Sequence, residues 1–198
     1  MEKTLIFIDK AFLSKLSNYL GRGKYIRFDR IKFSENLAQQ EKLICKEIFL
    51  YTSPPFQSNQ PSDEEEKRKR GYDRFINNLR ERKVVVREGR CQRLKINEKF
   101  EYHQKGVDVL ITMDLTNIPL QYPEVKRIIL ISSDSDFVPV IKNLEKNGVK
   151  TIVYTYYEKN RNSQFSRSND LIKSVYKYRI ISINDLLKTK LQEKEKND

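Results

Sequence analysis

Several residue types are scarce in this chain of 198 residues, and each scarcity narrows the chemistry open to it. His103 is the only histidine, which disfavours Ser-His-Asp triads and ribonucleases that use two histidines. Cys45 and Cys91 form no C-x-x-C motif, and with a single histidine they do not supply the ligands of a zinc site. We expect both cysteines to be reduced core residues.

Long apolar runs are also absent. No run approaches the roughly 20 residues that cross a bilayer, and the run at residues 5–8 is too short for a signal-peptide core. We therefore expect a soluble, cytoplasmic protein with no membrane partner. The chain shows no internal repeat and no clear linker, so we expect one domain over residues 1–187 and a polar, frayed tail over residues 188–198.

Positive charge is abundant. The chain has 39 Lys and Arg against 27 Asp and Glu, a net charge of +12 at pH 7. Basic residues dominate two stretches, residues 80–105 and 159–179, and tyrosines interleave with the second. Phosphate contacts together with base stacking are how proteins hold single strands, so we expect a nucleic-acid partner that binds as a single strand. The alternative is that these bases only keep the protein soluble and that some of the tyrosines lie in the core.

Short apolar runs alternate with amphipathic segments along the chain. The runs that we interpret as strands are residues 4–8, 43–51, 83–87, 127–131, 151–154 and 180–183. This alternation predicts a three-layer α/β fold, with a central, mostly parallel sheet flanked by helices. Residues 127–131 are apolar enough for a central strand covered on both faces. Residues 90–102 read as a hairpin-like arm that turns near residues 97–98.

Carboxylates follow two of the predicted strands. Asp9 follows the first strand, Asp134 and Asp136 follow the central one, and Asp108 opens a helix. The carboxyl ends of parallel strands meet at one sheet edge, and a hard divalent ion is the usual partner of clustered carboxylates. Such an ion activates water without a histidine. Taken singly, each of these acids is better explained as a helix cap, but capping is a poor explanation of all four. Asp114, six residues beyond Asp108, lies off that helix face.

Three motifs occur in a characteristic order: F-I-D at residues 7–9, K-G-V-D at residues 105–108 and S-S-D-S-D-F-V-P at residues 132–139. In this the chain resembles the NYN domain, the LabA-like branch of the PIN-like nucleases. The resemblance implies a PIN-like fold and an endoribonuclease that depends on Mg²⁺ or Mn²⁺. By motif position, it implies that the catalytic and metal-binding residues are Asp9, Asp108, Asp134 and Asp136.

Two positions depart from the family pattern. Phe12 stands where the family has Asn, and Ser133 stands where it has Gly. Phe12 favours an alternative in which the fold binds RNA or a partner without cutting it. A second alternative is a metal-dependent phosphohydrolase that acts on a small phosphate ester or on DNA.

The resemblance leaves substrate binding to be assigned from the residues. Lys105, beside Asp108, is the best-placed candidate to hold the RNA backbone, and Arg90, Arg93 and Ser133 are further candidates. A homodimer is a further expectation.

Overall fold

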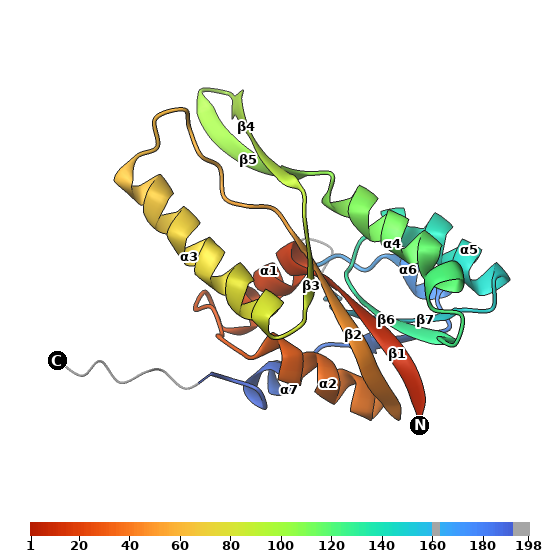
Figure 1. The fold of residues 1–198 in the computed structure, drawn as a ribbon. Helices are drawn as coiled ribbons and strands as arrows, with labels where there is room; N and C mark the ends of the chain where they lie inside the picture. Colours follow the sequence, from red (N-terminus) through yellow and green to blue (C-terminus); the bar gives the residue numbers. More distant parts are fainter. Residues whose placement is uncertain (160–162, 192–198) are drawn as a thin grey trace.

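A six-stranded sheet forms the centre of the structure, a computed structural model that describes residues 1–159 and 163–191 (Figure 1). Its strands, in spatial order, are β3 (Val85–Glu88), β2 (Leu43–Thr52), β1 (Glu2–Asp9), β6 (Arg127–Ile131), β7 (Lys150–Thr155) and β8 (Lys177–Ile180). All five strand pairs are parallel. The predicted parallel sheet is confirmed, with residues 127–131 near its centre.

Helices cover both faces of this sheet. One face carries α1 (Lys10–Leu20), α2 (Arg30–Gln40), α3 (Asp63–Glu81) and α7 (Ile183–Leu187). The other face carries α4 (Val107–Gln121), the 3-10 turn η1 (Ser135–Phe137), α5 (Val138–Lys146) and α6 (Asn169–Ser174). Successive side chains of β1 serve the two layers in turn, because a strand alternates its faces: Ile6 and Ile8 pack under α1, and Leu5 and Phe7 pack under α4. The three-layer α/β architecture is confirmed.

The C-terminal region differs from the prediction in two ways. The last strand ends at Ile180, and Ser182 instead begins the short helix α7. The reason is a capping box: the Ser182 hydroxyl accepts a hydrogen bond from the Asp185 amide, and the Asp185 carboxylate accepts one from the Ser182 amide. Farther along, Leu191 donates its amide to Arg27, where fraying from residue 188 was expected. Residues 192–198 of the predicted tail lie outside the described residues.

The predicted hairpin forms a separate two-stranded antiparallel sheet, here called the arm, made of β4 (Arg90–Ile96) and β5 (Lys99–Lys105). Asn97 and Glu98 at its turn have φ values of 47° and 64°, the positive values that a tight two-residue hairpin requires. The arm stands away from the six-stranded sheet, at the end where α4 begins (Figure 1). Gly106 joins the arm to α4 with a left-handed φ of 80°.

No helix in the described ranges is long and apolar enough to span a bilayer.

Candidate active site

Two of the predicted acids lie at the carboxyl ends of adjacent strands. Asp9 is the last residue of β1, and Asp134 follows β6, which pairs with β1 up to Ile8 and Ile131. Each acid also caps the helix or turn that follows it. The Asp9 Oδ1 accepts a hydrogen bond from the Phe12 amide at 3.1 Å, and the Asp134 Oδ1 accepts one from the Asp136 amide at 2.9 Å. Capping thus fixes the orientation of both carboxylates at the sheet edge.

Ser132 connects these two acids, and sequence reasoning missed it. Its side chain is fully buried, and its Oγ lies 3.3 Å from Asp9 Oδ2, to which it donates a hydrogen bond. The same Oγ accepts a hydrogen bond from the Asp134 amide at 3.2 Å. The neighbouring Ser133, predicted to bind substrate, instead lines a small crevice beside α6 with Ser168 and Leu171. The sequence signal for Ser132 was a hydroxyl residue directly after the apolar run at residues 128–131.

Asp108 lies close enough to the other predicted acids for their charges to interact with its own. It lies in the first turn of α4. Partial burial raises the pKa of Asp108, and the negative charges of Asp134 and Asp136 raise it further. Burial also raises the pKa of Asp9; the Phe12 amide lowers it, and the charge of Asp108 adds to the rise. Asp108 is therefore the acid that is linked electrostatically to each of the other three.

The donor set determines which cation would fit this edge. Its side chains offer only carboxylate and hydroxyl oxygens, which are the ligands of hard divalent ions. Within residues 1–159 and 163–191, no group of three His, Cys, Asp or Glu side chains is arranged so that it could hold a metal ion as placed. Mg²⁺ keeps several of its waters and takes one or two protein carboxylates, so the residues fit a hydrated ion rather than a closed cage.

Asp114 lies outside this cluster, as its spacing predicted. Its carboxylate accepts a hydrogen bond from the Tyr51 hydroxyl at 2.8 Å and two from the Arg87 guanidinium at 3.0 and 3.2 Å. These contacts tie α4 to β2 and β3. Asp114 is therefore a structural residue beside the site.

The basic candidates lie along the arm. Arg90 and Lys105 pair across its base, and Lys105 precedes the junction with α4. The Arg93 guanidinium lies over two aromatic rings, with its Cζ 4.5 Å from the centroid of Phe56 and 4.6 Å from that of Phe100. Arg93 is therefore part of an aromatic stack on the arm, whereas Lys105 is close in the chain to Asp108.

Phe12 packs into the core. Its side chain is 6% exposed and meets the ring of Phe165 edge to face, with centroids 6.4 Å apart. It belongs to the apolar cluster beneath α1 and α2, on the sheet face opposite the layer that contains α4. An asparagine at position 12 would therefore place an amide in an apolar environment in this chain.

A comparison with solved structures finds a similar fold. A crystal structure of a protein of unknown function from Vibrio parahaemolyticus RIMD 2210633 is similar in fold, with a TM-score of 0.60 and 22% sequence identity. The match covers 93% of this chain and 95% of that one. No curated protein matches the chain.

The family model described as the NYN domain matches residues 3–176. NYN domains are PIN-like proteins, generally nucleases of the kind that use divalent metals. Membership of the LabA-like branch stays a prediction. The matched residues contain all four acids and all three motifs, and the chain belongs to the NYN domain family.

Proposed function

We propose that this protein is a metal-dependent endoribonuclease that hydrolyses RNA phosphodiesters at Asp9, Asp108, Asp134 and Asp136. The observation that supports the proposal is that Asp9 and Asp134 lie at the carboxyl ends of the paired strands β1 and β6 and are joined through Ser132. Asp108 lies near enough for its charge to raise the pKa of Asp9, after the larger effect of burial. Carboxylates that repel one another are stabilised by a cation, and a phosphodiester needs one to screen its charge.

Each residue has a separate part in this proposal. Asp108, Asp134 and the exposed Asp136 would hold a hydrated Mg²⁺ or Mn²⁺, in part through its waters, and Asp9 would complete the negative site. When bound, the ion would supply charge stabilisation and an activated water. Ser132 is a positioning residue, because its hydroxyl fixes the Asp9 carboxylate and the Asp134 amide together. These contacts keep the two strand ends in register beneath the substrate.

Single-stranded RNA is the proposed substrate. The net charge of +12 favours a polyanion, and the arm offers bases next to exposed aromatic rings. Phe100 and Tyr102 are 55% and 51% exposed, which leaves ring surface for nucleobases to stack on. We propose that Lys105 and Arg90 contact the RNA backbone near the acids. The aromatic stack around Arg93 would contact the RNA farther from the acids. Ser133 faces the α6 crevice and is the weakest of the predicted contacts.

The test is digestion of a labelled single-stranded RNA in Mn²⁺ or Mg²⁺, with an EDTA control. Asp134→Asn keeps the cap but removes a charge, and we expect it to cleave at least about a hundredfold more slowly. Asp63→Asn, a matched change at an exposed acid of α3, should cleave at the wild-type rate. Wild-type cleavage by Asp134→Asn would contradict the proposal.

The same assay addresses the alternatives. Phe12, which stands where the family has Asn, favours a module that binds RNA without cutting it. Binding with no cleavage in either metal would support that module. Cleavage of a small phosphate ester or of DNA in preference to RNA would support the phosphohydrolase. The single domain over residues 1–187, the homodimer and the cytoplasmic location stay predictions.

A further inference from the structure

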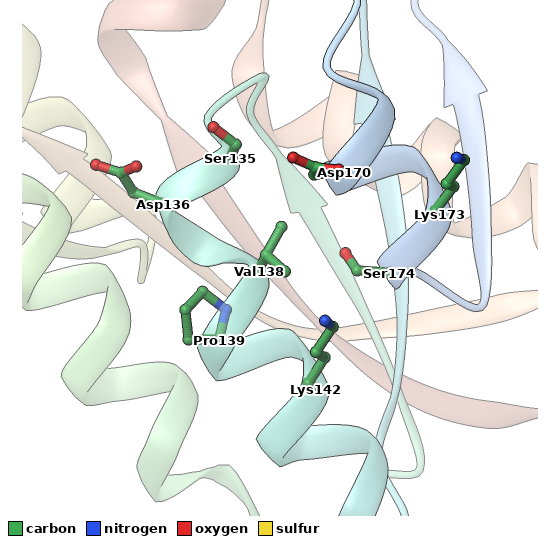
Figure 2. Close-up of a pocket in the computed structure, with 8 residues that line it drawn as sticks. All are labelled: Ser135, Asp136, Val138, Pro139, Lys142, Asp170, Lys173 and Ser174. Carbon is green, nitrogen blue, oxygen red and sulfur yellow. The ribbon is translucent and has the colours of Figure 1, made fainter.

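A groove runs between α5 and α6, and Asp136 is among the residues that line it (Figure 2). Its volume is about 660 Å³, within the range of small-ligand sites. Asp136, an acid of the proposed active site, lines it together with Ser135 and Asp170. Lys142 from α5 and Lys173 from α6 also line it. The groove is therefore continuous with the proposed active site and contains charges of both signs.

The geometry of α5 separates the negative charge of Asp136 from the positive charge of Lys142. Val138 and Lys142 lie one turn apart on α5, so the lysine stands roughly 6 Å farther along the helix axis than the valine. Asp136 precedes that turn. The acid thus lies where the chain leaves β6, and Lys142 lies deeper along the groove. Val138 and Pro139 form an apolar surface between them.

The charges of the groove do not neutralise one another. In the part of the chain that the structure describes, no ion pair joins Lys142 or Lys173 to an acid, and none joins Asp136 or Asp170 to a base. Elsewhere the protein does pair acids with bases, as for Asp114 with Arg87. Two lysines that line an open groove are suited to an anion, and the acids that line it with them are suited to a cation that accompanies the anion.

We propose that this groove holds the RNA strand next to the scissile phosphate, with Lys142 and Lys173 contacting its backbone phosphates. The inference rests on the proposed function and adds the path of the substrate beyond the acids. A phosphodiester chain with its divalent ion matches the groove, because it places anions at the lysines and a cation at the carboxylates. The apolar surface of Val138 and Pro139 suits the face of a sugar or a base.

The test measures binding of a labelled 12-nucleotide single-stranded RNA by fluorescence anisotropy, in EDTA and at several salt concentrations. For the double variant Lys142→Gln/Lys173→Gln we expect about tenfold weaker binding. The slope of log affinity against log salt should become shallower by about 1.4, because each lost phosphate contact on a single strand contributes about 0.7.

A matched control is the double variant Lys126→Gln/Lys146→Gln. It removes the same charge from exposed lysines at the opposite edge of the sheet, before β6 and at the end of α5. It should bind within about twofold of wild type, since neither lysine lines the groove. Equal losses in the two double variants would overturn the inference, because net charge alone would then explain binding.

Comparison with the cleavage assay separates this inference from the proposed function. Loss of affinity confined to Lys142→Gln/Lys173→Gln, with no cleavage by wild type, supports the groove and overturns the ribonuclease. Cleavage that depends on Asp134, with both double variants binding alike, supports the ribonuclease and overturns the groove. A wild-type protein that binds no RNA overturns both.

Discussion

Strand β6 and the arm are stabilised in opposite ways. Residues 128–131 of β6 are completely buried between two helical layers, and the strand has a hydrogen-bonded neighbour on each side. Every residue of β5 in the arm is exposed, and β4 is its sole sheet partner. A two-stranded hairpin by itself is marginally stable in water, so the arm requires other contacts.

Those contacts are aromatic. Arg93 lies against the rings of Phe56 and Phe100, and the Tyr102 ring lies 5.8 Å from Phe56, which belongs to the loop after β2. The stack ties the arm to the body of the protein yet leaves rings exposed. The comparison teaches that burial fixes β6, whereas the arm keeps apolar and cationic surface in contact with solvent, where a ligand can reach it.

The largest expected effect is on the free energy of unfolding, from a substitution in the buried strand β6. Leu130→Ala removes a fully buried side chain, and we expect the free energy of unfolding to fall by about 3 kcal/mol. Urea denaturation measures it, with Phe100→Ala on the arm as the control, expected to change the free energy by less than about 1 kcal/mol. Similar losses in both variants would mean that the arm is as integral to folding as β6.

The edge strand β8 provides the next test, because a buried acid holds it. Glu41 is 2% exposed at its side chain and pairs with Lys177 and Arg179 of β8. Burial acts to raise the pKa of Glu41, but these two partners outweigh it and leave the pKa below its ordinary value. Glu41→Gln should lower the free energy of unfolding by about 2 kcal/mol at pH 7.

The pH dependence of that loss has a definite sign. A depressed carboxyl pKa stabilises the fold above the unfolded-state pKa, and this contribution disappears as the pH falls through the folded-state pKa of Glu41. The stability difference between wild type and Glu41→Gln should therefore shrink in urea titrations from pH 7 to pH 3. A difference that stays constant would show that packing, and not charge, holds β8. The Arg93 stack should not respond, because arginine stays protonated.

A smaller effect is expected for RNA binding by the arm. Phe100→Ala should weaken binding of a single-stranded RNA by about tenfold, since base stacking on an aromatic ring contributes about 1–3 kcal/mol. Ile44→Ala, at a 47% exposed apolar residue of β2, is the matched control and should bind as wild type does. Anisotropy titrations measure both, and equal affinities of the two variants would remove the arm from the binding surface.

The smallest effect concerns the stack alone. Arg93→Lys keeps the charge but loses the planar group that lies on the two rings. We expect less than about 1 kcal/mol of global destabilisation, with faster hydrogen exchange at the amides of the arm and unchanged exchange in β6. Unchanged exchange in the arm would show that the stack does not hold it in place.

The sequence predicted the sheet well because its strands are apolar runs that local pattern can identify. It predicted α7 and the residues after it poorly, because these depend on a five-residue helix and on pairing with Arg27 far away in the chain. The acids of the candidate site followed from strand ends and motifs, but from sequence capping and a place in the site were alternatives. In the structure Asp9 and Asp134 cap the helix and the turn that follow them and also contact Ser132. Ser132 was missed because its bond to Asp9 spans 123 positions and exists only through the register of β1 with β6.

The glycine at the base of the arm has a mechanical consequence. Gly106 is the single residue between the last residue of β5 and the first of α4, and its left-handed backbone suits a residue without a side chain. On the other side of the base, a side chain at Gly89 would lie 2.4 Å from the carbonyl oxygen of Lys105. The backbone of Gly106 therefore sets the direction in which α4, with Asp108 in its first turn, leaves the arm.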